Sequence, residues 1–200
     1  MINLTKGQNV RIDKDVQKVR VGLSWDVSGN GQEVDLDVLA IELDNKTDGK
    51  CISDEHVVFY NSIKKTSSGK PTDPNESVIH SGDNRTGEGE GDDETIEVDL
   101  SKVDPRVQAI LFVVNIYDAF NRHQNFGQVK NPRARLYFGS DTVPDLVYEL
   151  DEDFSTQICV EFCMLYRHDG QWKFKAVGDG NENDLLKELQ KYGVPVAGNA

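Results

Sequence analysis

The chain has 200 residues, a length that suits one domain, spanning residues 1–200, with a sizeable core. It carries 35 acidic and 22 basic side chains, and its formal net charge is −13. Such a charge excludes nucleic acid as an expected partner, because phosphates would be repelled. It also disfavours docking on anionic lipid unless a bound divalent cation reverses the charge locally, so membrane association stays open.

The termini and the cysteines predict a compartment. Residues 1–17 are polar and lack the apolar segment of a signal peptide. No run in the sequence approaches the roughly 20 apolar residues of a membrane helix. The cysteines number three, are widely spaced and come without a secretion signal, which is typical of a reducing environment. We therefore expect a cytoplasmic protein.

Two patterns in the first quarter of the chain predict strands. Residues 18–27 alternate apolar and polar side chains, as a half-buried strand does. After the turn at residues 28–31, a second strand is expected over residues 34–43, where Asp35 and Asp37 share a face with Leu39, Ile41 and Leu43. Two carboxylates that continue an apolar face belong near the end of a sandwich, where a site can open to water.

The rest of the chain predicts further strands and one helix. Residues 108–118 are apolar on both faces and form the best candidate for a central strand. A hairpin is expected across Asp169-Gly170, and residues 64–77 read as an exposed loop. Helical spacing of leucines predicts a helix over residues 182–192, with Asn181 or Asn183 as its cap. Other short strands are expected at residues 57–61, 95–100, 133–138 and 146–150. Together these elements predict an all-β fold, an antiparallel β-sandwich with a short C-terminal helix.

The segment Gly82–Glu94 is the most distinctive stretch of the chain. It holds six carboxylates and four glycines in thirteen residues, with Arg85 as its one cation. Such a loop is either a solvated acidic turn or a cage for a hard cation such as Ca²⁺. It is not an EF-hand, because Arg85 and Glu88 occupy template positions and strands flank it. Its acidic side chains also disfavour phosphate binding.

Other oxygen-bearing side chains favour the cation hypothesis. Asp26, Asp35 and Asp37 lie at strand ends beside turns, and Asn61 ends another predicted strand. If these ends meet the 82–94 loop, roughly ten oxygen-bearing side chains gather, and since Ca²⁺ takes 6–8 oxygens there is room for one or two ions. The alternative is that Asp35 and Asp37 form a solvated strand end.

Other chemistries have weaker support. Cys159 and Cys163 are four residues apart, but on a strand that spacing separates them by about 13 Å, too far for one Zn²⁺. The sequence lacks a nucleophile signature such as Gly-x-Ser-x-Gly. Paired acids suggest glycoside hydrolysis, yet this many acids in one loop system fit a cation better. We expect no catalytic activity.

Taken in order along the chain, the sequence motifs resemble those of the TerD family. This family is named for tellurium resistance and is grouped with bacterial stress proteins. The resemblance covers most of the length. Its main motifs are Gly22-Leu23-Ser24-Trp25-Asp26, Asp35-Leu36-Asp37, Phe59-Tyr60-Asn61, the whole of Gly82–Glu94, Gln124-Asn125-Phe126-Gly127-Gln128-Val129 and Leu165-Tyr166-Arg167-His168.

The resemblance implies a β-sandwich that binds Ca²⁺ through its acidic loops and has no known catalytic step. It also implies a role in stress or toxic-anion resistance, with another protein of a stress or resistance complex as partner. By matched motif, the implied metal ligands are Asp26, Asp35, Asp37, Asn61, Asp83, Asn84, Glu88, Asp92, Asp93 and Glu94.

The chain departs from the family pattern in three places. The family's Asp-Leu-Asp-Ala-Ser is Asp35-Leu36-Asp37-Val38-Leu39 here, which keeps the acids and changes the packing. The family often has Ile-His-Asp-Ala after the central strand, where this chain has Ile116-Tyr117-Asp118-Ala119, so any role of that histidine is lost. The 64–77 loop is longer than the family leads us to expect. Two alternatives to the Ca²⁺-binding stress protein remain at this point: a C2-like module that binds lipid through Ca²⁺, and a hydrolase that uses paired carboxylates.

Overall fold

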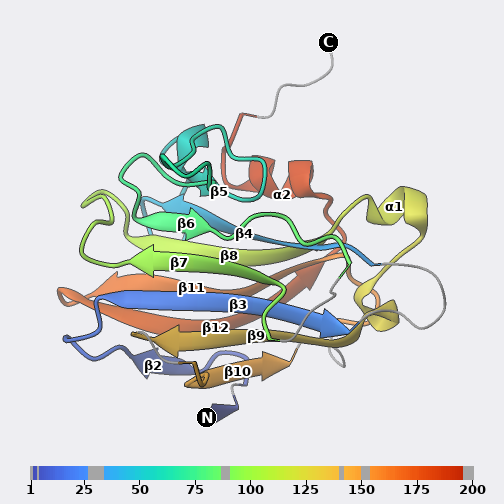
Figure 1. The fold of residues 1–200 in the computed structure, drawn as a ribbon, viewed down its shortest axis with the longest axis horizontal. Coiled ribbons are helices and arrows are strands. Elements are labelled where there is room, and N and C mark those ends of the chain that lie inside the picture. Colours follow the sequence, from blue (N-terminus) through green and yellow to red (C-terminus); the bar gives the residue numbers. More distant parts are fainter. Residues whose placement is uncertain are drawn as a thin grey trace.

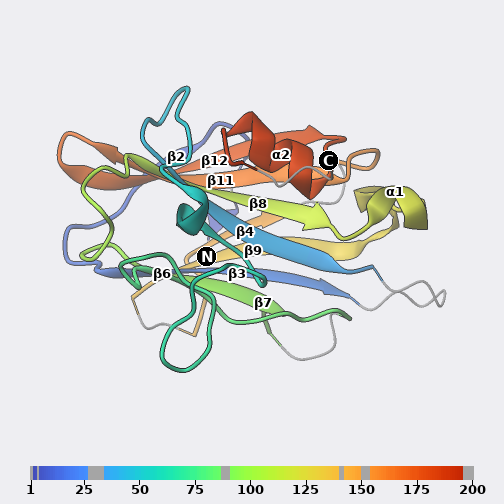
Figure 2. The same ribbon diagram turned by 90° about the horizontal axis from the view of Figure 1, so that it is seen from above.

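The computed structural model describes residues 2–3, 5–26, 34–86, 91–139, 142–149 and 154–195. Its strands form two six-stranded sheets that lie face to face (Figures 1 and 2). The first sheet has the order β1 (Ile2–Asn3), β10 (Leu146–Glu149), β9 (Lys130–Phe138), β3 (Lys18–Asp26), β7 (Glu94–Asp99) and β6 (Val78–His80). The second has the order β2 (Asn9–Arg11), β12 (Gln171–Asn181), β11 (Cys159–His168), β8 (Ala109–Ile116), β4 (Leu36–Leu43) and β5 (Val57–Val58). Every named pair is antiparallel except β1 with β10.

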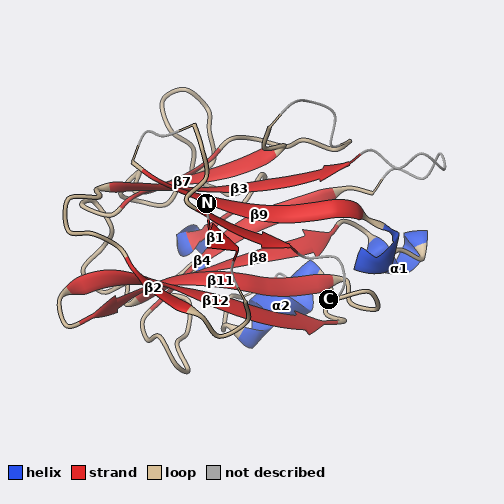
Figure 3. Cartoon of the chain, turned by 90° about the horizontal axis from the view of Figure 1, so that it is seen from below, coloured by secondary structure: helices blue, strands red, loops and turns tan. Residues whose placement is uncertain are grey.

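Helices cover one face and one end of this sandwich. Helix α2 (Leu185–Lys191) lies on the outer face of the second sheet, and the short helix α1 (Ala119–Arg122) lies beyond the end of β8 (Figure 3). Two 3₁₀ turns, η1 (Asp54–His56) and η2 (Phe126–Gln128), complete the elements. The predicted antiparallel β-sandwich with a short C-terminal helix is confirmed. Within the described residues, no helix is long and apolar enough to cross a membrane.

The core has two parts because the second sheet is buried on both faces. Inward side chains such as Val21, Leu23 and Phe112 fill the space between the sheets. Leu39 and Ile41 point the other way and pack with Leu189 of α2 in a second cluster. This explains the apolar character of β8 on both faces, and β8 does lie inside its sheet, between β11 and β4.

Some predicted boundaries need correction. The N-cap of α2 is Asp184, whose side chain accepts a hydrogen bond from Lys187 N, and the helix runs over seven residues rather than 182–192. The side chains of Asn181 and Asn183 donate instead to Glu188 Oε2. The 64–77 loop is only partly exposed, because residues 71–73 and 77 are buried whereas Asn75 and Glu76 are exposed. Asp73 is fully buried, and its carboxylate accepts hydrogen bonds from the backbone of residues 75, 77 and 78, which close the turn before β6.

Candidate cation site

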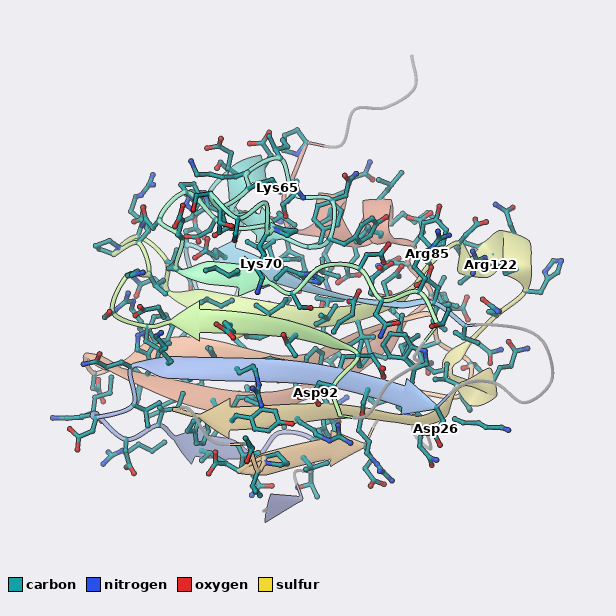
Figure 4. The ribbon with its side chains drawn as sticks, viewed as in Figure 1. Asp26, Lys65, Lys70, Arg85, Asp92 and Arg122 are labelled. Carbon is teal, nitrogen blue, oxygen red and sulfur yellow. The ribbon has the colours of Figure 1, made fainter. Side chains whose placement is uncertain are left out.

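A cavity of about 240 Å³ opens at the end of the second sheet where β4 begins and β8 ends. The hydrogen bond from Tyr117 N to Asp35 O, 2.9 Å long, ties these two strand ends together. Side chains from four separate segments line the cavity: Asp35, Asp37, Tyr60, Asp83, Arg85 and Tyr117. The labelled side chains of Arg85 and Arg122 mark this end of the molecule in Figure 4.

Three of the lining residues bring carboxylates together. One oxygen each from Asp35, Asp37 and Asp83 lies within 4.8 Å of the other two. Asp35 and Asp37 are buried, with 5% and 4% of their surface exposed, whereas Asp83 is exposed. Asp35 Oδ1 is buried and has no hydrogen-bond partner among the described residues. A buried carboxylate oxygen without a donor is costly, so the site favours a positively charged ligand.

The electrostatics of the cavity agree with this geometry. Burial, followed by the charge of Asp83, raises the pKa of Asp35 to about 6. Burial, followed by the charges of Glu94 and Asp35, raises the pKa of Asp37 to about 8. Both shifts show that the folded chain by itself disfavours ionised carboxylates here.

The chain supplies little positive charge of its own to the cavity. Arg85 Nε lies 3.9 Å from Asp35 Oδ2, but its side chain is 69% exposed. Arg122 stacks on the ring of Tyr117 at 5.2 Å and lowers the pKa of Asp35 from a distance. An exposed arginine contributes little in water, so the cluster remains undercompensated.

Glu94 and Asp93 hold the acidic loop against the strands. Glu94 Oε2 accepts a hydrogen bond from Val38 N (2.9 Å), and Glu94 Oε1 accepts one from Asn84 N (3.2 Å). Asp93 Oδ2 accepts from Trp25 N, and Asp93 Oδ1 accepts from the Asn84 amide. These contacts fix Asn84, and hence the neighbouring Asp83, beside the start of β4.

A neutral histidine lies behind Glu94. His80 Nδ1 accepts a hydrogen bond from Gly82 N at 3.0 Å, so its proton sits on Nε2. His80 Nε2 then donates to Val38 O (3.2 Å), and Glu94 Oε2 is 3.5 Å away. His80 therefore positions the loop and does not neutralise Glu94.

The structure does not bring all the predicted ligands to this cavity. Asp26 is exposed and accepts a hydrogen bond from Asn131. Asp92 forms an ion pair with Arg135 at 2.8 Å and lies flat against the first sheet, where a Cβ at Gly22 would come within 2.2 Å of its carboxyl carbon. Asn61 is exposed and does not line the cavity, and Glu88 lies outside the described residues.

Sequence reasoning missed the aromatic lining of the site. Tyr60 and Tyr117 form its walls, and burial together with Asp37 raises the pKa of Tyr60 to about 12, so this hydroxyl stays protonated. Tyr60 precedes Asn61 in the motif Phe59-Tyr60-Asn61, and Tyr117 stands where the family often has histidine. Each tyrosine stands next to a polar side chain of its motif, Asn61 or Asp118, and this adjacency is the signal in the sequence for the aromatic lining.

The donor set fits a hard divalent cation. Three carboxylates offer up to six oxygens, and Ca²⁺ takes 6–8 oxygen ligands in flexible geometry. Cysteine and histidine, which zinc prefers, do not line this cavity in the described residues. Among the described residues this is the single cluster of three or more potential metal ligands.

Comparison with known proteins gives a consistent result along the whole chain. The family model described as TerD domain matches residues 1–192. Tellurium resistance protein TerD of Serratia marcescens is 42% identical over 197 residues, which covers 96% of this chain and 97% of that protein. General stress protein 16U of Bacillus subtilis is also 42% identical, over 98% of both chains.

Solved structures share the fold. A crystal structure of a protein of unknown function superimposes with a TM-score of 0.72 at 24% identity and covers 92% of this chain and all of that chain. A homologue of telluride resistance protein (TerD) from Streptomyces coelicolor A3(2) gives a TM-score of 0.69 at 22% identity, over 87% of this chain and 95% of its own. At these identities the likeness concerns the fold alone.

Proposed function

Since this chain belongs to the TerD family, we propose that it is a Ca²⁺-binding module of a stress-response or tellurium-resistance system. Relatives bear both names, as tellurium resistance and general stress proteins. The observation that carries the metal proposal is the cavity in which Asp35, Asp37 and Asp83 converge around the unpartnered Asp35 Oδ1.

In this proposal Asp35, Asp37 and Asp83 hold one ion, and the surrounding residues position them. Asp93, Glu94 and Asn84 keep the loop that carries Asp83 in place through their hydrogen bonds. A bound divalent cation supplies the positive charge that the cavity lacks, so all three carboxylates ionise without mutual repulsion. The described residues offer one such cluster, which favours one ion over two.

The ion would also change the surface that a partner meets. Next to the cation cavity lies a groove of about 360 Å³ that shares Asp37, Tyr60 and Tyr117 with it. Phe120 and Leu186, which are 52% and 56% exposed, line this groove. Ca²⁺ binding would neutralise the negative charge of the cavity beside these exposed apolar side chains. A protein partner could then bind the groove only when Ca²⁺ is present. We propose such a partner from the same stress or resistance system.

We further propose that the module acts in the cytoplasm by binding and without a catalytic step. Serine, cysteine and histidine do not line the cavity within the described part of the chain. Its charged groups are three carboxylates and Arg85, a set that serves to hold a cation rather than to activate a nucleophile.

Calorimetric titration with Ca²⁺, and with Mg²⁺ for comparison, tests the proposal. We expect saturable binding, with a stabilisation of about 2.7 kcal/mol at a Ca²⁺ concentration of 100 times Kd. For a chain of this size that corresponds to a rise in Tm of roughly 5–10 °C. Asp37→Asn and Asp83→Asn should abolish both effects. Asp48→Asn, which removes the same charge from the exposed turn at residues 44–50, should retain them.

The opposite result is clear-cut. A wild-type chain that shows neither heat nor a Tm shift at millimolar Ca²⁺ would contradict the metal site. Equal loss in all three variants would show that the cation responds to net charge and not to the cavity.

A second candidate function is Ca²⁺-dependent binding to anionic lipid. It is favoured by the basic side chains that flank the exposed apolar ones, since Arg122 stacks on Tyr117 and Lys187 lies 5.4 Å from the ring of Phe120. Pelleting with phosphatidylserine vesicles distinguishes the candidates. Sedimentation with the vesicles that needs Ca²⁺ and is lost in Phe120→Ala would favour lipid, whereas no sedimentation would favour the protein partner.

A further inference from the structure

A second pocket lies on the outer face of the second sheet, at the end remote from the cation cavity. The hairpin between β11 and β12 marks this end in Figure 1, opposite α1. The pocket measures about 310 Å³. Strands β2, β11 and β12 and the turn at residues 44–50 contribute its lining: Asn9, Lys46, Thr47, Met164, Tyr166, His168 and Lys175.

The charge of this pocket is opposite to that of the whole molecule. Lys46 and Lys175 line it, and no carboxylate does so among the described residues. The strand register places Lys173 beside Tyr166, and Arg11 beside Lys173. Within the described residues, none of these four cations has a carboxylate within 4 Å. In a chain of net charge −13, such a gathering of unpaired cations is conspicuous.

The contacts inside the pocket show what Lys46 lacks. Its Nζ lies 3.2 Å from His168 Nδ1 and 5.6 Å from the centre of the Tyr166 ring. Because Lys46 is a donor only, His168 Nδ1 must accept, and the imidazole proton then sits on Nε2, 3.3 Å from the exposed Asp169. The ammonium of Lys46 is thus paired with neutral groups alone. An anionic oxygen would give it a stronger, charge-assisted hydrogen bond.

Hydrogen bonds within the chain hold the floor of the pocket in place without a ligand. Tyr166 Oη donates to Asn9 Oδ1 at 3.0 Å, and the Asn9 amide donates to Gly7 O, also at 3.0 Å. The rings of Tyr166 and His168 lie 6.4 Å apart and stand side by side on β11. The N-terminal strand β2 is thereby fixed against the two rings, and the cations converge over a preformed surface.

We propose that this pocket binds a phosphate-type oxyanion, with Lys46 and Lys175 providing the charge and Tyr166 and His168 forming the floor. The cations repel one another when the pocket is empty, and a multiply charged anion relieves that repulsion. The carboxylate cavity at the other end repels anions, so the two ends of the sandwich take ligands of opposite sign. Lysine amines bind phosphate as point charges, and Lys46 and Lys175 supply two such charges at this pocket.

Nuclear magnetic resonance titration of the full chain tests the proposal, with inorganic phosphate and pyrophosphate as probes and sodium chloride added to keep the ionic strength constant. We expect saturable shifts confined to the amides around residues 46, 166–168 and 175 and to the His168 ring. The double variant Lys46→Gln/Lys175→Gln should weaken binding by roughly tenfold or more, the loss typical of one charge-assisted hydrogen bond. Both side chains are exposed, so folding should be unaffected.

A matched control removes two cations elsewhere. Lys65→Gln/Lys70→Gln changes the net charge equally in the exposed first half of the 64–77 loop, where Figure 4 labels both side chains, and should leave binding intact. Absence of a saturable shift at a phosphate concentration on the order of 10 mM would overturn the proposal. So would equal weakening in the two double variants, because it would indicate a general field effect.

A further arm identifies the source of the phosphate. Vesicles containing phosphatidic acid that bind the wild type but not the Lys46→Gln/Lys175→Gln variant would make the ligand a lipid headgroup. Response to the free anions only would make it a soluble phosphorylated compound. A chain that ignores both probes but forms a dimer sensitive to the same variant would overturn the proposal, since the acidic end of a second copy would then be the occupant.

Discussion

The molecule contains two carboxylate clusters that each include two buried acids, and they differ in how many positively charged and hydrogen-bonding partners the chain supplies. Under helix α2, Glu161 and Glu188 are close neighbours, and burial, followed by the interaction with Glu188, raises the pKa of Glu161. Lys191 forms an ion pair with Glu161, and Tyr192 Oη donates to the same oxygen at 2.5 Å. Asn181 and Asn183 donate to Glu188 Oε2, and Lys191 Nζ lies 3.6 Å from Oε1.

The cluster of Asp35, Asp37 and Asp83 has fewer cations and hydrogen-bond donors around it. Its nearest cation, Arg85, is largely exposed, and one oxygen of Asp35 has no donor among the described residues. The first cluster is completed by a lysine, a tyrosine and two asparagines of the chain, although Glu188 Oε1 has only the ion pair with Lys191 and no hydrogen bond among the described residues. The second cluster receives no buried cation and is incomplete. A buried charge that the fold itself neutralises serves structure, whereas one that it leaves undercompensated is where a ligand from solution gains most.

Glu42 tests whether burial alone accounts for this difference, and it has the largest expected effect. The side chain is fully buried with both oxygens unpartnered in the described residues, and burial, followed by Asp73 and Asp104, raises its pKa to about 9. The folded chain keeps the proton that the unfolded chain loses near pH 4.5, so stability is lost as the pH rises toward 9. The wild type should lose on the order of 5 kcal/mol relative to Glu42→Gln between pH 5 and pH 9.

Urea unfolding at a series of pH values measures this loss. The exposed control Glu97→Gln should follow the wild-type curve. A constant difference between wild type and Glu42→Gln across this range would mean that Glu42 finds a partner or water. Glu42 is a lone acid without neighbouring ligand oxygens, so it should not respond to Ca²⁺.

Lys191→Met probes the completed cluster. It leaves Glu161 and Glu188 buried with a net negative charge, and removing one member of a buried pair costs about 3 kcal/mol or more. Because the Lys191 side chain is 47% exposed, we expect about 2–3 kcal/mol from urea unfolding at pH 7. Lys187→Met on the same helix is the control and should cost less than 1 kcal/mol. Equal losses would show that α2 is held by its leucines and not by the carboxylate cluster.

Asp35→Asn, in the incomplete cluster, should change the free energy of unfolding in the opposite direction and stabilise the ion-free protein. Without Ca²⁺ the variant removes a carboxylate that burial and Asp83 disfavour, so the ion-free protein should gain about 1–2 kcal/mol at pH 8. With Ca²⁺ the order should reverse, because the wild type alone gains from the ion. Thermal unfolding in EDTA and in excess Ca²⁺ gives both values. A variant less stable than wild type in EDTA would show that Asp35 already has a partner.

Much of the fold followed from local pattern. Alternation in residues 18–26, apolar character on both faces of β8, and Asp169-Gly170 at the hairpin each report a local backbone requirement. Both of those turn residues have positive φ, 52° and 71°, as a tight two-residue turn needs. The sequence pattern did not predict β1, β2 and β6. These strands are two or three residues long, which is too short for any periodicity to appear.

The candidate site was only partly predictable, because its geometry depends on contacts between distant segments. That acids gather near the start of β4 followed from the motifs. That Asp92 instead pairs with Arg135, 43 residues away, depends on the space left by Gly22 across the sheet. The predicted N-cap of α2 was wrong for a similar reason. The side chains of Asn181 and Asn183 donate hydrogen bonds to Glu188, a tertiary contact that local capping rules do not consider.

Arg85→Ala has the smallest expected effect and tests how Arg85 acts on Ca²⁺ affinity in the incomplete cluster. In the completed cluster Lys191 belongs to the structure, whereas Arg85, 3.9 Å from Asp35 Oδ2, would be a weak internal substitute for the ion. A cation that must be displaced or repelled lowers Ca²⁺ affinity, so its removal should tighten Kd by roughly two- to fivefold, the modest size reflecting its exposure. Calorimetry with Arg133→Ala, which loses an arginine paired with Glu149 on the first sheet, controls for net charge. If Arg85→Ala weakens binding instead, the guanidinium supports the loop that carries Asp83, and the two clusters are more alike than their exposures suggest.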